Sequence, residues 1–372
     1  MRFHERILPI LMAVFLMLPA CAGASGTWYC FDEEHVPEQL GYRVGGYTGS
    51  VTCTFLGDCT LGTTEKGKGS GHSITRTIRQ HGYAYPMSEL LELTAGDDIT
   101  IANLEGVLTD RQLEKVEKTF NFSGPSAYAA ILTEGSVECV SLANNHSYDY
   151  GAEGLLDTKS ALKQSAVSWF DETHMCVWES DEGLMIGFVG VAFQLTGKRS
   201  TEFARQVRIL QDLGCSAVVV VMHAGEEYES TPTQAQKSIA RQAAELGATL
   251  VIGHHPHIIQ GYDLLGTMPV VYSLGNCVFG GNIRPKDRDA LTVQVDMRFA
   301  ESELEAMELR FYPILFTGRG DYNTYRPVFK SGTGAENALK KMEASTGMAL
   351  EVPEGKSYGV LKIGPENTMS TE

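Results

Sequence analysis

The chain has 372 residues, of which 43% are hydrophobic and 9% aromatic, and its formal net charge is −16. This composition is typical of a folded globular protein and excludes an intrinsically disordered one. The acidic balance also argues against binding to nucleic acid, because no dense run of Lys or Arg offsets it. The length suits one large or two smaller α/β domains.

The first 24 residues have the features of a secretory signal. Two arginines precede an apolar run over 7–18, and small residues follow it. Such a run is too short for a comfortable membrane span, so we expect export. Leu18–Cys21 resembles a bacterial lipobox, which would lipidate Cys21 and hold the protein on the outer face of the cytoplasmic membrane. Ordinary cleavage after Ala22 or Ala24 would instead give a secreted protein.

The rest of the chain divides into three segments by composition. Residues 25–50 are rich in Gly, Tyr and Ser without a period and predict an irregular lead-in. Over 51–316 short apolar runs alternate with helical stretches, which predicts an α/β domain with helices on the faces of a sheet. Residues 317–372 are polar and predict a C-terminal tail that is partly disordered.

The apolar runs and amphipathic stretches predict the following elements. Strands are expected at 51–56, 99–104, 139–142, 185–191, 217–222, 249–252 and 268–273. Helices are expected at 85–93, 126–132, 154–165, 200–213 and 233–246. Period-two alternation over 291–299 and 307–316, around a turn at 301–302, predicts an antiparallel hairpin.

Eight cysteines are present, and seven remain if Cys21 is lipidated or removed, so they cannot all pair within one chain. None has the Cys-x-x-Cys spacing of a zinc–thiolate site. Cys30 is a candidate for a disulfide bridge, with its partner left open.

Side chains able to bind metal follow the predicted strands. Each alone is more often a turn or structural residue than a ligand. In a mostly parallel sheet, however, the carboxyl ends of the strands meet at one edge, so these residues would line one crevice. They are Asp58, Glu105, Asn145 with His146, His223, and His254, His255 and His257 in the run Gly253–His257.

Carboxylate, amide and imidazole ligands together suit manganese, iron or zinc, and we expect one or two divalent ions. Such an ion can lower the pKa of a bound water or hold the oxygens of a phosphoryl group. Asn145 would bind through its carbonyl oxygen. His146 is placed to give a proton to a leaving group or to stabilise charge on it.

Six motifs carry a family resemblance: Phe55–Gly62, Ala102–Gly106, Leu142–Gly151, His223–Tyr228, Gly253–Gln260 and Tyr272–Asn276. In order and spacing they resemble the CapA family of bacterial capsule and poly-γ-glutamate biosynthesis proteins, which is similar to the calcineurin-like metallophosphoesterases.

This resemblance implies a four-layer α/β/β/α sandwich and assigns the site residues by position. His146 and Asp149 would be catalytic. The implied metal ligands are Asp58, Glu105, Asn145, His223, His255 and His257, with His254 as an alternative to His255.

Three positions depart from the usual pattern. Metallophosphoesterases usually begin with Asp-x-His, whereas Thr60 follows Asp58 here; the CapA family generally lacks this histidine too, which indicates one metal or a weaker second one. Ala224 and Cys277 stand where Trp and Phe are common, which indicates a more open pocket.

We therefore expect an exported, metal-dependent, phosphoesterase-like hydrolase that acts on capsule or cell-envelope polymer. One alternative is a non-catalytic accessory or binding subunit of a polyglutamate synthase or export complex, working with its membrane subunits. Another is hydrolysis of amide bonds in polyglutamate or peptidoglycan. The substrate would be an anionic envelope polymer or a phosphoester. Arg284, Lys286 and Arg288 form a small basic cluster that could offset the acidic total for a polyanionic substrate, although a run of this kind is more often a solvated loop.

Overall fold

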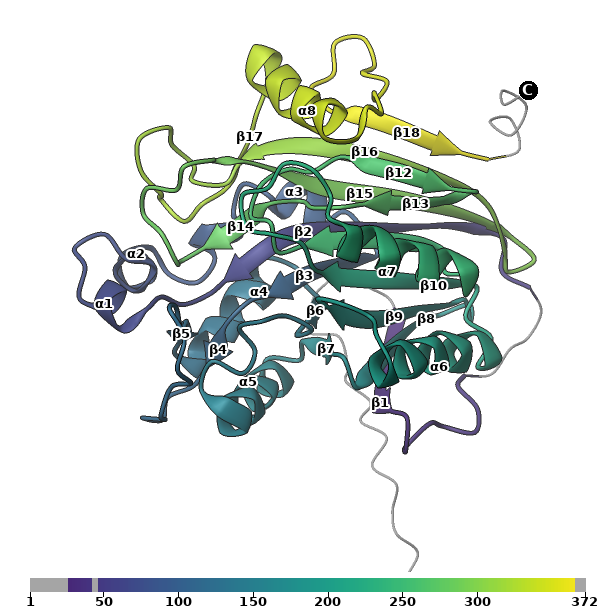
Figure 1. The fold of residues 1–372 in the computed structure, drawn as a ribbon, viewed down its shortest axis with the longest axis horizontal. Helices are drawn as coiled ribbons and strands as arrows, with labels where there is room; N and C mark the ends of the chain where they lie inside the picture. The colour runs from purple at the N-terminus through teal and green to yellow at the C-terminus, as the bar shows by residue number, and fades with distance from the viewer. Residues whose placement is uncertain (1–25, 42–45, 365–372) are drawn as a thin grey trace, which may run out of the picture.

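The computed structural model describes residues 26–41 and 46–364, which form a mixed α/β fold built on two main sheets (Figure 1). The predicted signal at 1–24, including Cys21, lies outside the described residues. Among the residues described, no helix has the length and apolar character needed to cross a membrane.

The first sheet has seven strands, and its centre is parallel. Antiparallel pairings extend it at both edges. In spatial order its strands are β1 (Gly26–Asp32), β8 (His174–Ser180), β9 (Met185–Ala192), β10 (Ala217–His223), β11 (Leu250–His254), β13 (Met268–Val271) and β12 (Tyr262–Leu265).

The second sheet has nine strands, with a parallel part around β2 and an antiparallel part that begins at β15. Its main path is β17 (Val328–Phe329), β16 (Glu303–Leu315), β15 (Asp289–Ala300), β2 (Gly49–Thr60), β3 (Ile99–Leu104), β6 (Cys139–Ser141) and β7 (Ser168–Phe170). Off this path, β14 (Asn276–Phe279) pairs with β2 and β18 (Gly359–Ile363) with β16. A separate ribbon joins β4 (Val107–Leu108) to β5 (Ser123–Gly124).

The helices are mostly short. They are α1 (Glu65–Lys68), α2 (Ile74–His81), α3 (Leu91–Thr94), α4 (Ala130–Glu134), α5 (Gly151–Gln164), α6 (Lys198–Asp212), α7 (Gln234–Glu245) and α8 (Gly332–Thr346), with 3₁₀ turns η1 (Tyr85–Met87) and η2 (Ser126–Ala129). Figure 1 shows α6 and α7 beside the strands β9 and β10, and α8 beside β16 and β18.

Strand β10 is apolar up to its last residue, His223, and its packing explains why. Its side chains alternate between two faces. Val219 and Val221 pack with Phe55 of β2 in a core shared by both sheets, whereas Val218 packs with Phe203 of α6 in a second core. Because both faces are covered, the strand reads as a continuous apolar run.

The strands and the hairpin predicted between 51 and 316 are confirmed, with small differences at their ends. The predicted helix at 85–93 is instead broken into η1 and α3. Helix α7 begins where expected because Thr233 and Gln236 form a capping box, in which each side chain bonds the other's backbone N–H.

Two segments that composition predicts to be irregular or partly disordered contain regular structure within the described residues. Part of the predicted irregular lead-in is strand β1, whose Trp28 is buried against the shared core by pairing with β8. The segment after 317, predicted as a partly disordered tail, contains α8 and β18 within the described residues. Ala338, Leu339 and Met342 of α8 pack on the shared core, and this apolar face is diluted in sequence by the Gly, Lys and Glu around it.

Cys30 pairs with Cys176, which answers the question that the sequence left open. The bridge joins β1 to β8 across a sequence separation of 146 residues. Four other described cysteines, Cys53, Cys59, Cys139 and Cys277, are buried and form no disulfide.

Glu138, which precedes β6, supplies a test of pH-dependent stability. It is buried, and its Oε2 accepts a 2.7 Å hydrogen bond from the Thr100 backbone N–H. Burial raises the pKa of Glu138 to about 8. Since the folded pKa lies above the unfolded one, the protein should lose stability as the pH rises from about 4.3 through 8.

Glu138→Gln keeps an acceptor for Thr100 but removes the titration. We expect it to raise the free energy of unfolding by about 5 kcal/mol at pH 9 and by about 1 kcal/mol at pH 5. Denaturant titrations at both pH values measure this. An equal effect at both pH values would contradict the assignment.

Candidate metal centre

The polar residues predicted at the strand ends do converge. The strands β2, β3 and β6 are parallel to one another, as are β10 and β11, so the residues at their carboxyl ends meet between the two sheets. All nine predicted site residues are joined by the contacts described below: Asp58, Glu105, Asn145, His146, Asp149, His223, His254, His255 and His257.

Asp58 is fully buried near the end of β2. Its Oδ1 accepts a 2.8 Å hydrogen bond from Asn103 Nδ2, and its Oδ2 lies 3.2 Å from His257 Nδ1. Although burial opposes ionisation, the neighbouring imidazoles hold the pKa of Asp58 well below its ordinary value. Gly57 lets β14 approach here, because a Cβ on it would lie 2.2 Å from the Gly275 carbonyl oxygen.

Glu105 directly follows β3 and is also fully buried. Neither of its carboxylate oxygens has a hydrogen-bond partner. Its Oε1 lies 3.6 Å from His223 Nε2, 3.8 Å from His146 Nε2 and 3.9 Å from His257 Nε2. Burial raises the pKa of Glu105 to about 8. A buried carboxylate surrounded by imidazoles, yet bonded to none of them, fits a cation that binds between them.

His223 ends β10 and lies between two asparagines. Its Nε2 is 2.8 Å from Asn145 Oδ1 and its Nδ1 is 3.2 Å from Asn103 Nδ2. Burial, helped by the other histidines, lowers its pKa well below the ordinary value, so the ring is neutral. Neutral imidazole is the form that binds metal.

His255 and His257 follow β11 and form the tightest candidate cluster with Glu105. One ligand atom from each of the three residues lies within 4.8 Å of the other two. Burial opposes protonation of His257, but the Glu105 and Asp58 carboxylates raise its pKa to about 9, so a metal would displace this proton. The backbone φ angles of His255 and His257 are positive, 98° and 59°, which is unusual for residues other than Gly.

The geometry favours His255 over His254 as the partner of His257. His254 Nδ1 lies 3.3 Å from Asp58 Oδ1 but is not aligned to hydrogen-bond with it. His255 Nδ1 is buried without a partner, and its ring centroid is 4.8 Å from that of His223. His254 therefore lies beside the Asp58 end of the site, and His255 beside Glu105.

His146 lies at the rim of the cluster with Asp149 buried behind it. His146 Nδ1 lies 2.8 Å from Asp149 Oδ2, which also accepts from the Phe122 backbone N–H. This contact leaves Nε2 facing Glu105. Asp149 therefore positions His146 and does not itself face the cluster. Burial lowers the pKa of His146, against the opposing effect of Asp149.

Three polar neighbours of the site were missed by sequence reasoning. Asn103 and Asn276 lie inside two of the motifs that carry the family resemblance, so these motifs could have identified them as site residues. Asn276 Oδ1 is 3.0 Å from His257 Nδ1. Lys118 had no signal, because it lies in a loop without periodicity. Lys118 forms an ion pair with Asp149 and donates a 2.8 Å hydrogen bond to the backbone carbonyl of Asn145.

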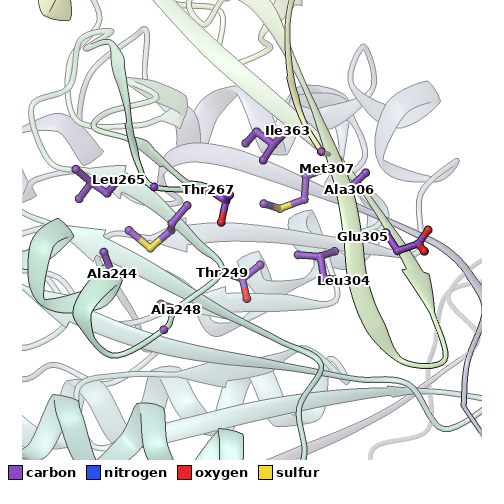
Figure 2. A pocket seen from close by; sticks show the side chains of 14 residues that line it. Ala244, Ala248, Thr249, Leu265, Thr267, Leu304, Glu305, Ala306, Met307 and Ile363 are labelled. Carbon is purple, nitrogen blue, oxygen red and sulfur yellow. The ribbon is translucent and has the colours of Figure 1, made fainter. Parts of the chain in front are cut away.

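A pocket of about 550 Å³ lies elsewhere in the molecule (Figure 2). Ala248 and Thr249, which precede β11, line it together with Met307 of β16. The candidate site lies at the other end of β11, and Glu305 is the one ionisable side chain lining this pocket. This pocket therefore lacks the metal-binding side chains that the histidine cluster has, and we place the functional site at the cluster.

The fold and the cluster define a protein with a candidate metal centre. The chain belongs to the bacterial capsule synthesis protein PGA_cap family, whose model matches residues 52–281. It is 26% identical over 305 residues to the capsule biosynthesis protein CapA of Bacillus anthracis, covering 75% of this chain and 71% of that protein. It is 22% identical over 341 residues to the PGA biosynthesis protein CapA of Bacillus subtilis (strain 168), covering 84% of this chain and 83% of that protein. The predicted family is confirmed.

Proposed function

We propose that this protein is an exported, metal-dependent hydrolase of phosphoesters that acts in the biosynthesis of a capsule or cell-envelope polymer. The role in capsule biosynthesis follows from the names of its relatives. The main support for a metal-dependent hydrolase is the environment of Glu105. Its two buried carboxylate oxygens have no hydrogen-bond partner, although three imidazoles surround them.

The residues that would hold one or two divalent ions are Asp58, Glu105, Asn145, His223, His255 and His257, with His254 beside Asp58. When bound, manganese, iron or zinc supplies Lewis acidity, which activates water and neutralises charge on a phosphoryl group. We also infer the layer order α/β/β/α, since α6 packs outside the first sheet and α4 outside the second.

The protein's own proton-transfer group would be His146. Asp149 keeps Nδ1 as the donor atom, so Nε2 is the atom that gives or takes a proton beside Glu105. In the hydrolysis, a water oxygen would bond to phosphorus as the water gives a proton to the unprotonated Nε2. The ester P–O bond would break, and Nε2 would pass that proton to the leaving oxygen.

Export is supported by the Cys30–Cys176 bridge, because disulfides persist in oxidising compartments. The competing function is that of a non-catalytic accessory subunit. Thr60 favours it, since this residue stands where a ligand histidine is usual and its buried Oγ1 has no hydrogen-bond partner.

Metal analysis and hydrolysis assays test the proposal together. The purified protein should hold about one or two divalent ions and cleave p-nitrophenyl phosphate or its bis-ester after manganese is added. His257→Ala should lower the metal content without unfolding the chain, whereas His35→Ala, at an exposed histidine, should change neither. A protein without metal and without hydrolysis would refute the enzyme, and an unfolded His257→Ala would make that residue structural.

A further inference from the structure

Three large aromatic side chains on loops around the cluster remain partly exposed. Phe193 is 42% exposed, Tyr228 43% and Phe120 54%. A single exposed aromatic residue needs no explanation. These three come from separate loops, however, and all border the same site.

Each exposed ring is linked to an imidazole of the site. The Phe193 centroid is 6.0 Å from that of His255, and the Tyr228 centroid is 6.3 Å from that of His257. Phe120 stacks at 6.3 Å on Phe122, whose ring is 4.6 Å from His146. A molecule whose reacting atom lies among the imidazoles would therefore meet these rings.

Phe193 and Tyr228 are held in place by an uncommon backbone. Their φ angles are 61° and 62°, in a region that bulky residues rarely adopt. The Phe193 N–H donates to the His223 carbonyl and the Tyr228 N–H to the Pro256 carbonyl, both at 2.8 Å. Strained conformations of this kind persist where the surrounding structure fixes them and are concentrated at functional sites.

The charge near Tyr228 restricts what can lie there. The exposed carboxylates Glu226, Glu227 and Glu229 flank it in sequence, and Glu227 interacts electrostatically with His257. A polyanionic chain would be repelled on this side of the site, whereas a neutral ring would not.

We propose that Phe193 and Tyr228, with Phe120 at the edge, form an aromatic subsite that stacks on a neutral ring adjoining the phosphoester of the substrate. The ring would be the sugar of a sugar phosphate or the base of a nucleotide, because the C–H face of a sugar and the flat face of a base can each pack on an aromatic side chain. This inference rests on the proposed function and gives it a substrate class.

Calorimetry on the manganese-loaded full chain compares three ligands: glucose 1-phosphate, uridine 5′-monophosphate and glycerol 3-phosphate. We expect at least one ring-bearing ligand to bind about 10-fold more tightly than the open-chain one. A preference for glucose 1-phosphate alone assigns a sugar, and one for the nucleotide alone assigns a base.

Phe193→Asn and Tyr228→Asn should each remove most of this preference while leaving glycerol 3-phosphate binding unchanged, because Asn tolerates positive φ. Phe193→Trp should retain it. Phe329→Ala, which removes a ring of matched 40% exposure on β17, should have no effect.

Binding does not require turnover, so the subsite and the hydrolase are tested separately. Absence of hydrolysis would contradict the proposed function alone. Equal affinity for ring and open-chain esters, no binding of any of the three, or an unchanged preference in both Asn variants would overturn the subsite.

Discussion

Replacing Glu105 with glutamine should make the metal-free protein more stable and, at the same time, remove its affinity for metal. The carboxylate is fully buried and neither oxygen has a hydrogen-bond partner. Above pH 8, where this carboxyl is ionised, leaving the charge unpaired costs about 1–3 kcal/mol, so the neutral glutamine should raise the free energy of unfolding at pH 9 by a similar amount. A ligand would be lost, and the metal affinity should fall by more than the roughly 10–100-fold that removal of an outer-shell partner costs.

Denaturant titration in chelator and metal titration by calorimetry measure the two effects. Glu138→Gln is the matched control, since Glu138 is a second buried glutamate whose pKa burial raises to about 8. It should stabilise the protein at alkaline pH and leave the metal affinity unchanged. If Glu105→Gln instead destabilised the metal-free protein and kept its metal, Glu105 would be a structural residue.

How far the fold was predictable depends on where each strand finds its partners. Strands such as β10 were predictable because both faces are covered, so every position before His223 is apolar. Strand β1 was not, because its partner β8 lies more than a hundred residues away and only that pairing buries Trp28. Helix α8 was missed for a similar reason, since its apolar face has a partner only once the two sheets are packed.

The candidate site was more predictable than the edges of the sheets. Its residues lie at the carboxyl ends of strands, and parallel pairing within each sheet, with packing of the two sheets on each other, brings those ends together. The choice between His254 and His255 was not predictable, because it depends on the positive φ angles at 255 and 257. Spacing in the sequence does not contain that information.

Lys118 shows what a sequence without an alignment leaves hidden. Its loop has no period, and the residues it contacts, Asn145, His146 and Asp149, are about 30 positions further along the chain. Its Nζ lies 3.2 Å from His146 Nδ1, but that nitrogen gives its proton to Asp149. Lys118 instead forms an ion pair with the Asp149 carboxylate and donates to the Asn145 backbone carbonyl.

Lys118→Met should therefore cost both stability and turnover. Asp149 is fully buried, the Lys118 side chain is only 27% exposed, and removing one partner leaves an uncompensated buried charge. We expect a loss of about 1–3 kcal/mol in the free energy of unfolding. A displaced His146 should also lower kcat by about 100-fold, because small misplacements of a reacting group are costly. The metal content should remain, as the ligand side chains are intact.

Two further variants separate positioning from general destabilisation. In Lys118→Met combined with Asp149→Asn, no buried charge is left unpaired, so stability should recover while kcat stays low. Lys330→Met breaks the Lys330–Asp289 ion pair, which includes none of the nine site residues, and should cost stability without lowering kcat. If the loss of kcat in Lys118→Met were matched by Lys330→Met, or disappeared when the double variant regained stability, Lys118 would have no role beyond holding its loop.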